Sequence, residues 1–143
     1  MNNNKQKSKR KILVVDDEPD SSTIFRLALE DNGFIVDAFN DSTLALSAFK
    51  PNSYDLVVLD IKMPKMNGYE LCEKIKKIDD KVKVCFLTAS EEQYAEELKT
   101  QLRKSYGASS SSSATASSSF DITLIRKPVT LDELVKKVDE ITA

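Results

Sequence analysis

Five short apolar runs recur along the chain, and a longer stretch with helical spacing of apolar residues follows each of them. The runs are Ile12–Val15, Phe34–Phe39, Leu56–Leu59, Val82–Leu87 and Ile122–Ile125. Runs that are apolar at successive positions are typical of strands buried on both faces of a parallel sheet. Five strand–helix units in a row therefore predict an α/β fold: a doubly wound five-stranded parallel sheet with helices on both faces and right-handed crossovers.

Residues that start and stop helices delimit the helical stretches. Pro19 suits the first turn of the first helix, and Gly33 suits the residue just beyond its end. Within this helix Ile24, Leu27 and Ala28 have helical spacing, so we expect them to face the sheet. Further helix caps are expected at Asn40 or Asp41, at Ser90 with Gln93, and at Thr130 with Glu133.

Polar residues with functional chemistry stand where four of the five strands end. Asp16 and Asp17 follow the first strand, Asp60 the third, Thr88 the fourth and Lys127 the fifth. In a parallel sheet these ends share one rim, where open α/β folds bind ligands. An acid after a strand more often caps a turn, but turn capping does not explain why all these residues share one rim.

The three carboxylates at this rim would repel one another, so the site invites a cation. Oxygen ligands without histidine or cysteine favour Mg²⁺. A carboxylate such as Asp60 can then act as a nucleophile toward a phosphoryl group and form an aspartyl phosphate. The hydroxyl of Thr88 and the ammonium of Lys127 are suited to contact the phosphoryl oxygens.

The composition excludes several other kinds of site. The chain has no histidine, which excludes ordinary zinc sites and catalysis by a histidine acid or base. Cys72 and Cys85 suit the core better than a disulfide or a metal pair. A net charge of −2 gives no overall attraction to nucleic acid or to an anionic membrane. No apolar run suits a membrane span or a signal peptide, so we expect a cytoplasmic protein.

Four motifs resemble those of the response-regulator receiver domain of two-component signalling, in particular its single-domain, chemotaxis-regulator-like members. They are VVDDE from Val14 to Glu18, LDIKMPKMNG from Leu59 to Gly68, LTAS from Leu87 to Ser90 and RKP from Arg126 to Pro128. The resemblance covers residues 11 to 143 and implies the (βα)5 flavodoxin-like receiver fold.

The resemblance also implies a role for each residue at the rim. Asp60 would be the phosphoacceptor, and a partner histidine kinase or phosphotransfer protein would supply the phosphoryl group. Thr88 would be the switch hydroxyl, and Lys127 would pair with the phosphoryl group. The chain would not be a turnover enzyme, because its only reactions would be self-phosphorylation and autodephosphorylation. The implied Mg²⁺ ligands are Asp17 directly, Asp16 through water, Asp60, and the Lys62 carbonyl.

Two features depart from the family pattern. Three residues before Lys127 the family usually has an aromatic side chain that swings inward on phosphorylation, and here that residue is Leu124. The run at residues 107–120 is mostly serine and alanine, and it lies where receivers commonly dimerise or dock partners. We interpret it as a flexible insertion, or an artificial or placeholder segment; the alternative is a serine phosphorylation region or a partner-binding loop.

We divide the chain into a disordered basic leader at residues 1–11 and a receiver domain at residues 12–143. The chain ends shortly after its last helix, so we expect an unidentified downstream protein as its output, with no nucleic-acid binding of its own and no membrane. The alternative function is a receiver-like binding module that acts without phosphorylation. A haloacid-dehalogenase-type phosphatase would want an acid where Lys62 stands, and the three glycines form no nucleotide-binding motif.

Overall fold

The computed structural model describes residues 10–88, 122–126 and 129–143 of the chain. Its strands form one sheet in the order β2-β1-β3-β4-β5, and every pairing is parallel. The predicted sheet is confirmed, and each strand agrees with its apolar run to within one residue at either end. The strands are β1 (Lys11–Val15), β2 (Ile35–Phe39), β3 (Leu56–Asp60), β4 (Lys83–Thr88) and β5 (Ile122–Arg126).

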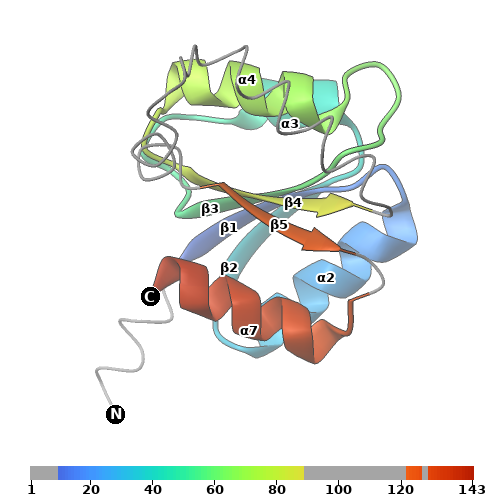
Figure 1. The fold of residues 1–143 in the computed structure, drawn as a ribbon, viewed down its shortest axis with the longest axis vertical. Helices are drawn as coiled ribbons and strands as arrows, with labels where there is room; N and C mark the ends of the chain where they lie inside the picture. The colour runs from blue at the N-terminus through green and yellow to red at the C-terminus, as the bar shows by residue number, and fades with distance from the viewer. Residues whose placement is uncertain (1–9, 89–121, 127–128) are drawn as a thin grey trace, which may run out of the picture.

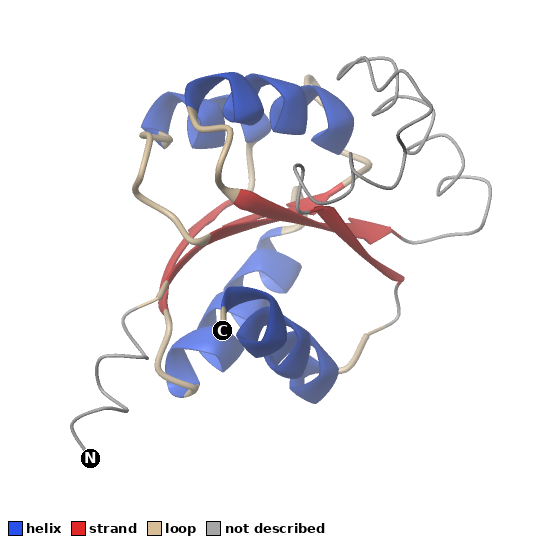
Figure 2. Ribbon diagram, turned by 60° about the vertical axis from the view of Figure 1, so that its left-hand side comes forward, coloured by secondary structure: helices blue, strands red, loops and turns tan. Residues whose placement is uncertain are grey.

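Helices cover both faces of the sheet. In the described part of the chain they are α2 (Pro19–Asp31), α3 (Ser42–Ala48), α4 (Gly68–Ile78) and α7 (Leu131–Thr142). Helices α2 and α7 lie on one face and α3 and α4 on the other, with the sheet as the middle layer (Figures 1 and 2). The helix expected from Ser90, the first nine residues of the leader and the serine-rich run lie outside the described residues. Among the described helices, none combines the length and apolar character needed to cross a membrane.

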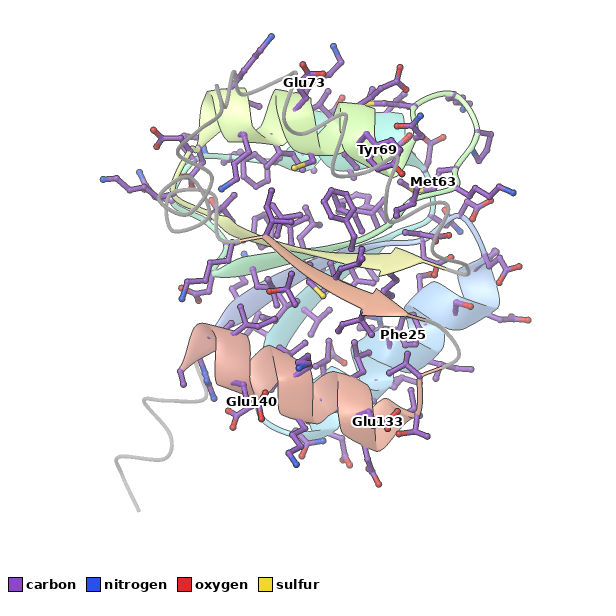
Figure 3. All side chains as sticks on the ribbon, viewed as in Figure 1. Phe25, Met63, Tyr69, Glu73, Glu133 and Glu140 are labelled. Atoms are coloured by element: carbon purple, nitrogen blue, oxygen red, sulfur yellow. The ribbon has the colours of Figure 1, made fainter. Side chains whose placement is uncertain are left out.

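The central strands are buried on both faces, so their alternate residues belong to two separate cores. In β1, Leu13 faces α3 and α4, whereas Val14 faces α2 and α7. Figure 3 shows Met63 and Tyr69 on the first side and Phe25 on the second. Cys72 and Cys85 are free thiols buried in different cores, which confirms that they pack as core residues. The first core includes Leu13, Val57, Leu71, Cys72 and Phe86, and the second core includes Val14, Phe25, Leu29, Cys85 and Leu134.

The predicted buried face of α2 is wrong. Ile24 and Leu27 are 46% and 53% exposed, whereas Phe25 and Leu29 are buried against the sheet. Both stripes have helical spacing, so periodicity alone does not distinguish them. The helix is rotated so that the larger aromatic ring is removed from water, which is the more favourable burial.

Arg10 connects the start of β1 to the end of α7 through an ion pair and a hydrogen bond. Its guanidinium forms an ion pair with Asp139 at 2.7 Å and donates a hydrogen bond to the Thr142 hydroxyl at 2.9 Å. The same group lies 4.8 Å from the centre of the Phe34 ring. Arg10 and Lys11 fall within the leader expected from the sequence, and here Lys11 is the first residue of β1.

Replacing the cap of α7 should lower stability by a modest amount. The Thr130 hydroxyl accepts a hydrogen bond from the Glu133 amide, and the Glu133 carboxylate accepts one from the Thr130 amide, as the sequence predicts. We expect Thr130→Ala to lower the free energy of unfolding by about 1 kcal/mol. Urea denaturation followed by circular dichroism measures the change. Thr130→Ser keeps the hydroxyl and should be close to wild type; an equal loss in both variants would assign the effect to the methyl group.

Candidate functional site

Three aspartates lie at the edge of the sheet where the parallel strands end. Asp60 is the last residue of β3, and Asp16 and Asp17 directly follow β1. Because Val15 of β1 pairs with Leu59 of β3, the residues that follow this pair come side by side. One carboxylate oxygen of each aspartate lies within 4.8 Å of those of the other two. The structure therefore brings together the three carboxylates that the sequence assigned to one rim. The arrowheads of β4 and β5 in Figure 1 point toward the same edge of the sheet.

The cluster concentrates negative charge in a largely buried place. Asp16 is 1% exposed and Asp60 is 8% exposed, while Asp17 is partly buried. Two unit charges separated by 4.8 Å repel by on the order of 3 kcal/mol at an effective dielectric constant of about 20. A bound divalent cation would replace this repulsion by attraction. The ligand atoms are all carboxylate oxygens, which fits Mg²⁺ and disfavours metals that prefer nitrogen or sulfur.

Asp16 also has a structural role in the turn between β1 and α2. Its Oδ1 accepts a hydrogen bond from the Glu18 amide at 3.0 Å, and its own amide donates to the Phe39 carbonyl at 3.1 Å. Aspartate commonly shapes the backbone after a strand in this way. The structural and the metal-binding interpretations of Asp16 are therefore compatible, since these contacts fix the carboxylate beside Asp60.

The other predicted site residues are described only in part. Thr88 is the last residue of β4, one position beyond Leu87, which pairs with Asp60. Strand β4 therefore ends at the same edge of the sheet as β3. The predicted role of the Thr88 hydroxyl as the switch stays a prediction. Lys127 lies outside the described residues. The Lys62 side chain is exposed, and the predicted role of its carbonyl as a metal ligand also stays a prediction.

Gly68 is a residue of this site that sequence analysis did not single out. A Cβ atom at this position would lie 2.5 Å from the Asp60 carbonyl oxygen and 2.9 Å from the Ile61 Cα. The Gly68 amide also donates a hydrogen bond to the Ile61 carbonyl at 2.9 Å. The first turn of α4 therefore touches the backbone of Asp60, an approach that only glycine allows. The motif contains this glycine, but nothing in the sequence pattern says which backbone it approaches.

Asp41 links the loop after Asp60 to helix α3. One of its oxygens accepts from the Thr43 and Leu44 amides and caps α3, and the other accepts from the Lys65 ammonium at 2.9 Å. Hydrogen bonds from Thr43 and Lys65 hold the pKa of Asp41 well below its usual range. The sequence predicts the helix cap, but it gives no sign of the partner 24 residues away.

Comparison with known proteins gives a consistent family match. The model of the response regulator receiver domain matches residues 12–105. The chain is 34% identical to the alkaline phosphatase synthesis transcriptional regulatory protein PhoP of Bacillus subtilis over 93 residues, which are 65% of this chain and 39% of that protein. The chain spans about a third of the length of the curated relatives that it matches.

Solved structures of the same kind share the fold. A CheY-like response regulator receiver domain protein from Methanospirillum hungatei is 25% identical with a TM-score of 0.73, and 92% of each chain is covered. The response regulator protein TrrA from Thermotoga maritima, solved in complex with Mg(2+)-BeF, is 30% identical with a TM-score of 0.68. That match covers 92% of this chain and 98% of the other. The sheet topology and the aspartate cluster therefore agree with the family match and with the fold of these solved structures.

Proposed function

The chain belongs to the response regulator receiver domain family, and from this premise we propose that Asp60 accepts a phosphoryl group from a partner histidine kinase or phosphotransfer protein. The observation that carries the proposal is the meeting of Asp16, Asp17 and Asp60 within 4.8 Å at the carboxyl edge of the sheet. Asp60 belongs to the central strand of the five, so residues from the neighbouring strands surround it. The similar structure from Thermotoga maritima contains Mg(2+)-BeF, which supports Mg²⁺ as the cation for this site.

In the proposed reaction an oxygen of the Asp60 carboxylate forms a bond to phosphorus. The bond between phosphorus and the imidazole nitrogen of the donor breaks, and the nitrogen keeps the electron pair. Mg²⁺, held by Asp16, Asp17, Asp60 and the Lys62 carbonyl, would neutralise charge as the phosphoryl group arrives. These 143 residues include no histidine, so the donor histidine lies outside them.

Two further residues would contact the phosphoryl group on Asp60. The Thr88 hydroxyl would donate a hydrogen bond to a phosphoryl oxygen, and the Lys127 ammonium would pair with another as a point charge. Apart from self-phosphorylation and autodephosphorylation, the chain would catalyse no turnover reaction. Its output would be contacts with a downstream protein in the cytoplasm, without nucleic-acid binding by these residues.

Intact-mass spectrometry tests this proposal. The protein is incubated with a small-molecule phosphodonor, with Mg²⁺ and with a chelator. We expect a single phosphoryl addition that requires Mg²⁺ and is lost in acid. No addition by a protein that calorimetry shows to bind Mg²⁺ would contradict phosphorylation.

A second function, partner binding without phosphorylation, is favoured by one observation. Leu124 stands where the family usually has an aromatic side chain, and it is 37% exposed on β5. A leucine in this position has no ring to swing inward when Thr88 contacts a phosphoryl group. Binding of Mg²⁺ without phosphoryl addition in the experiment above would select this alternative.

Lys127→Ala should separate Mg²⁺ binding from signal transmission. The lysine would pair with the phosphoryl group and not with the cation, so we expect the Mg²⁺ affinity to remain within about fivefold of wild type, which corresponds to about 1 kcal/mol. The phosphorylated variant should show much smaller amide chemical-shift changes than the phosphorylated wild type. An undiminished response, measured by nuclear magnetic resonance at equal phosphorylation, would remove Lys127 from the switch.

A further inference from the structure

The loop between β3 and α4, residues 61–67, follows the proposed phosphoacceptor and is held firmly at its base. Ile61 and Met63 are buried, and the Ile61 amide donates to the Leu87 carbonyl at 3.3 Å. At the other end Asn67 and Glu70 form a capping box at the start of α4. Pro64 and Lys65, between these anchored ends, are exposed. The position of the middle of the loop must therefore come from other contacts.

The backbone at Lys65 has an unfavourable conformation. Its φ angle is +69°, and the Met66 amide donates to the Pro64 carbonyl at 2.7 Å across it. A three-residue turn with positive φ at its centre is the strained form of the γ-turn, and a residue with a Cβ atom adopts it reluctantly. A contact outside the turn is needed to explain why a lysine retains this geometry.

The Lys65 side chain supplies that contact. Its ammonium lies 2.9 Å from Asp41 Oδ2, while Asp41 Oδ1 accepts from the amides that begin α3. Asp41 is therefore fixed to α3 by one oxygen and to the loop by the other. Hydrogen bonds from the Thr43 and Lys65 side chains lower the pKa of Asp41, so protonation would break these contacts only in more acidic solution than for an ordinary aspartate.

We propose that Lys65 and Asp41 are positioning residues for the phosphorylation site. Their ion pair holds the middle of the loop against the N-terminus of α3, and it completes the anchoring of a loop in which the neighbours of Lys62, Ile61 and Met63, are already buried. The inference rests on the proposed function, because it assigns a purpose to loop geometry at a Mg²⁺ and phosphoryl site. It concerns contacts that lie outside the aspartate cluster itself.

Two single substitutions distinguish positioning from simple electrostatics. Lys65→Met removes a positive charge from the loop after Asp60, and through space alone this change would strengthen Mg²⁺ binding. Asp41→Asn removes a negative charge and through space alone would weaken binding, while asparagine keeps the helix cap. Positioning predicts that both variants bind Mg²⁺ more weakly, because each one releases the loop.

Isothermal titration calorimetry with Mg²⁺ is the measurement. We expect each variant to lose about two- to fivefold in affinity, the size that one exposed ion pair can supply. The double variant should be no weaker than the weaker single variant, since both remove the same contact. Lys65→Arg should restore the affinity. At saturating Mg²⁺ the rate of phosphorylation by a small phosphodonor should return to the wild-type value, as expected of positioning residues that are not catalytic.

An exposed ion pair on α7, away from the loop, provides the control for the two substitutions. Lys137 and Glu140 form an exposed pair on α7, and Lys137→Met with Glu140→Gln should leave the Mg²⁺ affinity unchanged. Opposite changes in Lys65→Met and Asp41→Asn, or no change in either, would overturn the positioning role and leave the proposed function intact. A wild-type protein that does not bind Mg²⁺ would overturn both.

Discussion

Asp60→Asn is expected to abolish acid-labile phosphorylation while leaving the fold intact. The substitution is nearly isosteric, but an amide is not a nucleophile toward phosphorus, so labelling should fall by at least about 100-fold. Removing one of three clustered charges also relieves their repulsion in the absence of a cation. The variant should therefore be at least as stable as wild type without Mg²⁺, and Mg²⁺ should stabilise it less. Intact-mass spectrometry and thermal unfolding with and without Mg²⁺ measure both effects.

The control for this variant is Asp31→Asn. Asp31 is an exposed residue at the end of α2, and its substitution changes the net charge by the same amount. Labelling of Asp31→Asn should equal that of wild type. Undiminished labelling of Asp60→Asn would mean that the nucleophile is a different residue.

Gly68→Ala is expected to damage both the fold and the site. The added methyl group would lie 2.5 Å from the Asp60 carbonyl oxygen, and because its neighbours are backbone atoms no side-chain rotation relieves the contact. Either the first turn of α4 or the end of β3 must move. We expect a loss of about 1 to 3 kcal/mol in the free energy of unfolding. The Mg²⁺ affinity should also fall, by roughly tenfold, as it does when supports of metal ligands are removed.

Gly33→Ala separates the two effects of the Gly68 substitution. Gly33 has a φ of +93° and lies before the N-terminal end of β2, whereas Asp60 lies at the C-terminal end of β3. Alanine there is strained, so we expect a loss of about 1 kcal/mol in stability. The Mg²⁺ affinity of the folded Gly33→Ala protein should be unchanged. A Gly68→Ala protein that binds Mg²⁺ like wild type would show that the close approach does not position Asp60.

The sequence by itself determined the sheet and the identity of the clustered acids. Four consecutive apolar residues in a run such as Leu56–Leu59 have no polar face, which is typical of a short strand buried on both faces of a sheet, and all four are buried here. Because the strands are parallel, their ends meet at one edge, and Asp16, Asp17 and Asp60 follow from chain order alone. Capping patterns likewise predicted a helix cap at Asn40 or Asp41, which Asp41 provides, and the capping box at Thr130.

Only the tertiary structure decided how the elements fit against one another. The buried face of α2 depends on which residues the sheet can accommodate, and Phe25 is buried while Ile24 with equal periodicity is not. The approach of Gly68 to Asp60 and the pairing of Lys65 with Asp41 join segments that no local pattern connects. Such contacts depend on distances in space between residues far apart in the chain, whereas hydrophobic periodicity and capping patterns depend on neighbours only a few residues away.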